Sequence, residues 1–135
     1  MALITCRIMQ LYRAMIYVKD FHRMKEFYSE MLGVKPINET WADRWAEFDA
    51  GSARFALHAI PADIAKQIEV SSPPKPREKD PVKLVFEVNN VDAECARLTS
   101  LGVTMVQRPW GSWDGIDPEG NVFGIVDPER LRLGE

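Results

Sequence analysis

An internal repeat constrains this sequence more than any other feature. The segments Val18–Val34 and Val88–Val103 each begin where a strand is expected to end, continue through an expected helix, and finish in Leu-Gly-Val. Their starts lie 70 residues apart and their ends 69. Two copies are too few for a solenoid, which needs about three or more repeats to bury its faces. The repeat therefore predicts a domain made of two paired modules.

Each copy is predicted to fold as a strand, a helix and three further strands. In the first copy the β-branched and aromatic run Arg13–Val18 favours a strand, and Asp20 suits the N-cap of a helix that ends at Gly33. In the second copy Asn90 caps a helix that ends at Gly102. The strands expected after these glycines cover residues 35–40, 45–50 and 54–59 in the first copy, and 104–108, 112–116 and 122–127 in the second.

The predicted fold class is α+β, with duplicated βαβββ modules at residues 8–60 and 82–130 in one domain that spans residues 1–135. The proline-rich segment 61–81 is predicted to link them. With one helix for every four strands, the helices can cover only one face of each sheet. We therefore expect a curved mixed sheet around a cavity, with the helices on its outer face.

Charge and cysteine content exclude several classes of partner. Lys plus Arg is 17 and Asp plus Glu is 20, so a nucleic-acid partner is not expected. No apolar run reaches the roughly 18 residues of a membrane span, so a membrane partner is not expected either. The two cysteines, Cys6 and Cys95, lack the spacing of a disulfide framework or a zinc site. The first residues also lack the pattern of a secretory signal, and the expected location is the cytoplasm.

Two short motifs carry a resemblance to a known superfamily. They are Phe27-Tyr28 followed by Leu32-Gly33-Val34, and the turn Asp117-Pro118-Glu119-Gly120-Asn121. With the duplicated βαβββ order, they resemble the vicinal oxygen chelate superfamily of glyoxalases, extradiol dioxygenases, fosfomycin-resistance enzymes and bleomycin-resistance proteins. The resemblance covers residues 11–127 and implies the paired-module fold. The motifs are packing and turn elements, so they do not identify the chemistry.

The resemblance also implies where a divalent metal would be held in metal-dependent members. The ligands come from the first strand and the last strand of each module. Here those positions carry Arg13, Lys83, Gly124 and either Ala56 or, with the strand shifted by one pleat, His58. Arginine is not a metal ligand, and a lysine would first have to lose its proton. We therefore expect no metal cofactor, with the alternative of a divalent metal at a displaced site that uses His58, Glu47 or Glu87.

Arg13 and Lys83 occupy equivalent places in the two modules, where strand alternation turns both toward the cavity side together with Tyr17. Two cations that converge there would favour a carboxylate or a phosphate. The alternative is that both side chains reach solvent or pair with Glu47 or Glu87.

Tryptophans in matching segments suggest a pocket for a flat ligand. Trp45 and Trp113 are the candidates for contact with an aromatic ring, while Trp41 and Trp110 lie close by in the sequence. The alternative for all four is strand packing or a dimer interface.

Two function classes follow from these observations. The favoured one is a metal-free small-molecule binder, similar to the bleomycin-resistance branch, that takes an anionic or aromatic ligand. The alternative is a metal-dependent lyase, isomerase or dioxygenase with a displaced site. Because a curved sheet leaves edges and tryptophans exposed, we expect a homodimer in either case.

Overall fold

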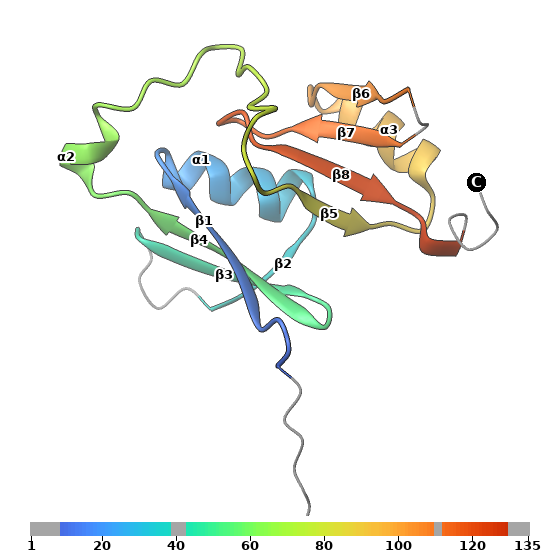
Figure 1. Cartoon of the computed structure of the whole chain (residues 1–135), viewed down its shortest axis with the longest axis horizontal. Coiled ribbons are helices and arrows are strands. Elements are labelled where there is room, and N and C mark those ends of the chain that lie inside the picture. The colour runs from blue at the N-terminus through green and yellow to red at the C-terminus, as the bar shows by residue number, and fades with distance from the viewer. Residues whose placement is uncertain (1–8, 39–42, 110–111, 130–135) are drawn as a thin grey trace, which may run out of the picture.

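Two four-stranded mixed sheets form the framework of the computed structural model, which describes residues 9–38, 43–109 and 112–129 (Figure 1). The strand order is β1-β4-β3-β2 in the first sheet and β5-β8-β7-β6 in the second. The strands of the first sheet are β1 Arg13–Val18, β2 Lys35–Asn38, β3 Trp45–Ala50 and β4 Ala53–Ala59. Those of the second are β5 Leu84–Glu87, β6 Met105–Gln107, β7 Trp113–Ile116 and β8 Val122–Val126.

The two sheets have the same pairing, which confirms the predicted duplication of an α+β module. The first strand of each module pairs in parallel with the last, β1 with β4 and β5 with β8. The other pairs in each sheet are antiparallel. Within the described part of the chain, the two sheets are not joined into one closed sheet.

The helices begin where the sequence predicted. Asp20 accepts a hydrogen bond from the Arg23 N–H at the start of α1, Phe21–Glu26, and Asn90 accepts one from Ala93 at the start of α3, Val91–Ser100. The first helix continues as a π-helical segment, η1 Phe27–Met31, which the sequence did not indicate. The linker contains a further short helix, α2 Ala62–Ala65, that was also not predicted.

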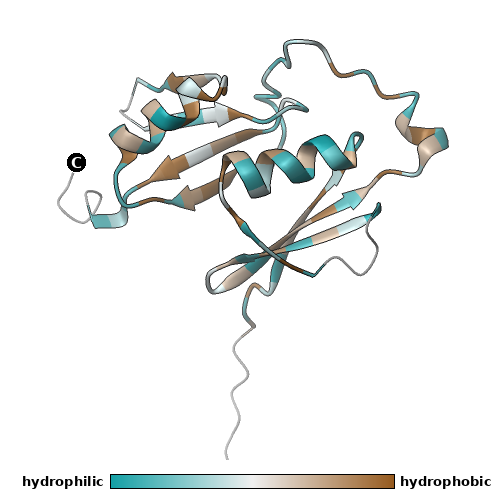
Figure 2. Ribbon diagram, turned by 180° about the vertical axis from the view of Figure 1, so that it is seen from behind, coloured by the Kyte–Doolittle hydropathy of each residue, from teal (hydrophilic) through white to brown (hydrophobic). Residues whose placement is uncertain are grey.

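One hydrophobic core serves both modules. The Phe27 ring lies 5.9 Å from that of Phe123 in the second sheet, and the Tyr28 ring lies 4.8 Å from that of Phe55 in the first. The α1–η1 helix therefore lies between the two sheets, and its outward side is hydrophilic (Figures 1 and 2). Each sheet turns one face toward this core. We call the opposite face of each sheet its open face.

The two family-like motifs bind each other across the modules. The Tyr28 hydroxyl donates a 2.7 Å hydrogen bond to the Asp117 carboxylate, and both groups are fully buried. Asp117 also accepts from the backbone of Glu119 and Asn121, while the Glu119 carboxylate accepts from the backbone N–H groups of Lys19 and Asp20. Burial raises the pKa of Tyr28, and the adjacent Asp117 raises it further. We call this network the clasp.

Within the described ranges, no helix has both the length and the apolar character needed to cross a membrane.

Candidate functional site

The open face of the first sheet carries a row of three aromatic side chains. Trp45, His58 and Tyr17 lie opposite one another on β3, β4 and β1. The His58 ring lies 5.8 Å from the Trp45 ring and 5.3 Å from the Tyr17 ring. His58 Nδ1 is buried and has no hydrogen-bond partner in the described ranges, so His58 offers mainly ring area. We call these three residues the ring row.

An ion pair lies beside the ring row. The Arg13 guanidinium lies 2.8 Å from the Glu47 carboxylate and 5.0 Å from the centre of the Trp45 ring. Arg54 approaches the same carboxylate at 3.6 Å. Burial alone would raise the pKa of Glu47, but the hydrogen bond and charge of Arg13, with the charge of Arg54, lower it below its ordinary value. Glu47 is therefore a buried carboxylate held in its ionised form by two arginines.

The second sheet repeats this arrangement. Lys83 Nζ lies 2.8 Å from the Asp114 carboxylate, and Arg108 Nε lies 2.6 Å from it. Asp114 lies opposite Gly124 on β8, as Glu47 lies opposite Ala56 on β4. In each module a cation at the start of the first strand thus reaches a buried carboxylate on the third strand, with a small residue on the strand between them. A side chain at Gly124 would begin only 3.2 Å from the Asp114 carboxylate.

The structure does not bring Arg13 and Lys83 together. They belong to different sheets, on the faces turned away from the shared core, so the convergence that the sequence suggested does not occur within the chain. Arg13 pairs with Glu47, which was the stated alternative. Lys83 pairs with Asp114 rather than Glu87. Asp114 was not among the residues predicted from the sequence, although a carboxylate inside the short strand Trp113–Ile116 is a visible signal.

The two candidate tryptophans face opposite sides. Trp45 shares the open face with His58, whereas Trp113 lies opposite Ile125 and packs against the core. The two rings therefore do not share a sheet face on which one ligand could contact both, and contact of Trp45 with a ligand stays a prediction. Trp41 and Trp110 lie outside the described residues.

The residues at the family's ligand positions do not fit a divalent cation. Arg13 and Lys83 are cations, and Ala56 and Gly124 have no donor side chain. The alternative metal site of His58, Glu47 and Glu87 is not assembled either, because Glu87 lies on the second sheet. The Glu47 carboxylate is also already paired with two arginines. Among the described residues, no three His, Cys, Asp or Glu side chains are grouped in a way that could hold a metal ion.

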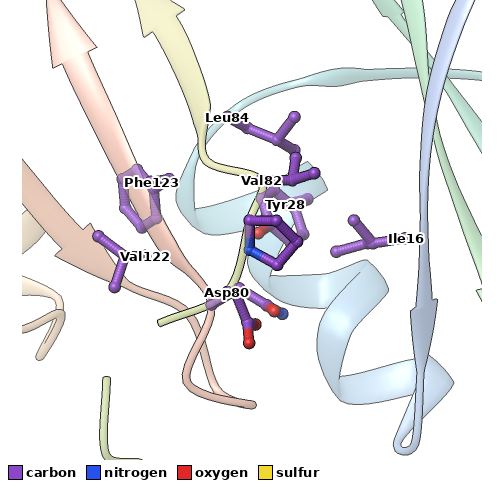
Figure 3. A pocket seen from close by; sticks show the side chains of 9 residues that line it. Ile16, Tyr28, Asp80, Val82, Leu84, Val122 and Phe123 are labelled. Atoms are coloured by element: carbon purple, nitrogen blue, oxygen red, sulfur yellow. The ribbon is translucent and has the colours of Figure 1, made fainter. Parts of the chain in front are cut away.

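Concave surfaces lie between the modules. A pocket of about 140 Å³ is lined from both modules, by Ile16 and Tyr28 on one side and Leu84 and Phe123 on the other (Figure 3). It is smaller than the roughly 300 Å³ of an ordinary ligand pocket. A groove of about 920 Å³ runs between the β3–β4 hairpin and β5 with α3, but its walls include core residues that are already buried, such as Phe55, Leu98 and Ile125.

Part of the exposed apolar surface lies on the open faces. Tyr17 of the ring row is 58% exposed, and Val85 on the second sheet is 53% exposed. Met15, which lies between Arg13 and Tyr17 on the same face of β1, is also exposed. Such surface is what a ligand or a second chain would bury.

Comparisons with known proteins agree with this architecture. The family model of the glyoxalase-like domain matches residues 13–126. The structure of TnmS3, an antibiotic binding protein from Streptomyces sp. CB03234, is similar at 23% identity with a TM-score of 0.64, covering 91% of this chain and 98% of that one. Lactoylglutathione lyase from Agrobacterium tumefaciens is similar at 18% identity with a TM-score of 0.62, covering 90% and 95%.

A glyoxalase/bleomycin resistance protein/dioxygenase from Nocardioides is similar at 17% identity with a TM-score of 0.62, covering 90% of this chain and 85% of that one. Comparison with curated proteins gives no match. The solved structures establish the fold, and the family model covers most of the sequence. The duplicated βαβββ topology and the match over residues 13–126 show that this chain belongs to the glyoxalase-like domain family of the vicinal oxygen chelate superfamily.

Proposed function

We propose that this protein binds a flat aromatic small molecule on the ring row without a resident metal ion. The observation that carries the proposal is the row of Trp45, His58 and Tyr17 on an open sheet face, with more than half of Tyr17 exposed. Aromatic rings bind other rings through large apolar area and offset or edge contacts. A soluble domain has little reason to expose such a row unless something covers it.

A structural neighbour supports the same class of function. TnmS3 is described as an antibiotic binding protein, and it has the same fold over almost its full length. We therefore favour binding of a small molecule over the alternative of a metal-dependent lyase, isomerase or dioxygenase.

The donor chemistry supports binding without a metal cofactor. Two of the four family ligand positions carry cations, and the nearby carboxylates of Glu47 and Asp114 each already bind two cationic side chains. Metal analysis of protein purified without chelator should find only substoichiometric divalent ions. About one tightly bound ion per chain, lost in His58→Ala, would contradict this part of the proposal.

We further propose a homodimer in which the open face of the first sheet lies against the open face of the partner's second sheet. Within one chain these faces point away from the shared core, so the ring row and Val85 can meet only between two copies. The strands β1 and β5 lie at the edges of their sheets, and uncovered edges favour association. The ligand would then be enclosed by both chains.

Light scattering at micromolar concentration tests the assembly and should give the mass of two chains. Val85→Arg puts a charge on the open face of the second sheet and should yield a monomer. The matched control is Ile64→Arg, at an exposed apolar position of α2 outside both sheets, which should remain dimeric. A wild-type monomer would contradict the dimer.

Titration with N-phenyl-1-naphthylamine, an uncharged aromatic dye, tests the binding site. Trp45→Ala should weaken binding about fivefold or more, because a ring contact contributes about 1 kcal/mol beyond its buried area. Ser112→Ala, at the equivalent position of the second module, should bind like the wild type. Equal affinities of wild type and Trp45→Ala would remove the ring row as the site.

A cytoplasmic location stays a prediction from the sequence.

A further inference from the structure

We infer that the ring row selects uncharged aromatic molecules over anionic ones, and that Glu47 sets this selectivity by neutralising Arg13. This inference rests on the proposed function, because it names the class of ligand that the same site would take. It replaces the anionic ligand that the pair of cations, Arg13 and Lys83, suggested from the sequence alone.

Two nitrogens of Arg13 are already used by Glu47. Arg13 Nε and one terminal nitrogen donate to the same Glu47 oxygen, at 3.1 and 2.8 Å. This is one of the two edges of the guanidinium that a carboxylate can engage with two parallel hydrogen bonds. An anionic ligand would have to displace Glu47 to use this edge, and at the other edge it would meet a guanidinium whose charge Glu47 already balances.

Displacing Glu47 is unfavourable because its carboxylate is almost completely buried. Only 2% of Glu47 is exposed, and its neighbours across the sheet are Ala56 on β4 and Asn38 on β2. Without Arg13, the nearest cation to the carboxylate would be Arg54, at 3.6 Å. A buried charge that loses its closest partner is strongly destabilised, so the Arg13–Glu47 pair should persist when a ligand binds.

The charges around the ring row are also nearly balanced. On the open face of the first sheet, Arg13 and Arg54 are matched by Glu47 and Asp49, and Lys35 on the edge strand β2 adds one further cation opposite Asp49. The second sheet, which would face it in the dimer, is no more positive. Its Lys83 and Arg108 are matched by Asp114 and Glu78. There Glu87 also occupies the position that Tyr17 has in the first module.

The paired arginine still has a use for an aromatic ligand. Its guanidinium lies 5.0 Å from the centre of the Trp45 ring and 5.1 Å from that of Tyr12. A planar guanidinium held in this way stacks on rings through its face while its edge stays bound to Glu47. The ion pair thus extends the flat surface of the ring row without adding net charge.

Two dyes with the same ring system separate charge from shape. N-phenyl-1-naphthylamine is uncharged, and 1-anilinonaphthalene-8-sulfonate adds a single sulfonate. The measured quantity is the ratio of their dissociation constants for each protein, which cancels general changes in the pocket. The wild type should bind the uncharged dye at least about tenfold more tightly.

Glu47→Gln should raise the affinity for the sulfonate dye about tenfold or more, because Arg13 gains a free charge-assisted hydrogen bond, and leave the uncharged dye within about twofold. The matched control is Glu30→Gln on η1, which changes the net charge equally at an exposed position on the helix side. Its ratio should stay at the wild-type value. A Glu47→Gln ratio equal to that of the wild type would overturn the inference.

Arg13→Met tests the inference from the other side and does not depend on whether Glu47→Gln folds. Removing the cation should shift the ratio further toward the uncharged dye, and an unchanged ratio would overturn the inference.

Failure of the proposed function would give a different result. If Trp45→Ala leaves the binding of the uncharged dye unchanged, the ring row is not the site and both proposals fail. If binding depends on Trp45 but the ratio of dissociation constants does not change in Glu47→Gln or Arg13→Met, only the inference about selectivity is wrong.

Discussion

The open faces of the two modules share one charge arrangement and differ in the side chains next to it. Both have a cation, a buried carboxylate and a small residue at matching positions, as Arg13, Glu47 and Ala56 in the first and Lys83, Asp114 and Gly124 in the second. Beside this arrangement the first module has Trp45, His58 and Tyr17, where the second has Ser112, Val126 and Glu87. The two copies thus share the ion pair that supports the sheet, whereas the surface available to a ligand is aromatic only in the first.

The hairpin turns of the modules differ as well. Between β3 and β4, Asp49 accepts one exposed hydrogen bond from the Gly51 backbone. Between β7 and β8, Asp117 is completely buried and accepts hydrogen bonds from Tyr28, Glu119 and Asn121. The turn of the second module is therefore bonded to the first module's helix. The hydrogen bond described for Asp49 stays within its own turn. The two hairpin turns should therefore contribute unequally to the free energy of unfolding.

The largest effect should come from breaking the clasp. Asp117→Ala leaves the buried Tyr28 hydroxyl and two backbone N–H groups without an acceptor, and each lost bond to a charged group costs about 1.5–3 kcal/mol. We expect the free energy of unfolding, measured in urea, to fall by about 3 kcal/mol or more. Asp49→Ala in the equivalent hairpin should cost less than about 1 kcal/mol. Equal losses would show that the two turns contribute alike.

The next effect distinguishes the two buried carboxylates. Asp114→Asn should lower the free energy of unfolding by about 2 kcal/mol, because it weakens two close contacts, with Lys83 at 2.8 Å and Arg108 at 2.6 Å. Glu47→Gln should cost less, since its second cation, Arg54, is 3.6 Å away. Partial exposure of the cations keeps both losses below those of a fully buried pair. A larger loss in Glu47→Gln would reverse our ranking of the two ion pairs.

The contribution of Glu47 should also depend on pH. Although burial opposes ionisation, Arg13 and Arg54 lower the pKa of Glu47 below its ordinary value of 4.5, so the folded state binds fewer protons there than the unfolded state. The stabilisation is complete above about pH 4.5 and is lost as the pH falls through the lowered pKa. The stability difference between wild type and Glu47→Gln should therefore narrow in acid. A difference that stays constant below that pH would contradict this assignment.

The smallest effect separates the two tryptophans. Trp113→Leu should lower the free energy of unfolding by about 1 kcal/mol, because Trp113 packs against the core beside Ile125. It should leave the affinity for N-phenyl-1-naphthylamine within about twofold, in contrast to Trp45→Ala. A loss of dye affinity in Trp113→Leu with unchanged stability would contradict the proposal that the dye binds on the open face of the first sheet.

Several features were predictable because they depend on local chemistry. The caps at Asp20 and Asn90 formed as expected, since a short polar side chain satisfies the first free N–H groups of a helix. Strand alternation correctly turned Arg13 and Tyr17 away from the residues that pack under the helix, because successive side chains point to opposite faces. The π-helical segment and α2 were missed, as neither has a distinctive local pattern.

The sequence by itself determined the duplicated topology, the caps and the residues on each face of the strands, since these follow from short-range periodicity and backbone geometry. Only the tertiary structure decided that Lys83 meets Asp114, that Trp113 faces the core, and that Arg13 and Lys83 lie on different open faces. These outcomes depend on strand register and on how two sheets pack around one helix. Register is set by contacts between residues far apart in the chain, and a change of one residue reverses every side chain.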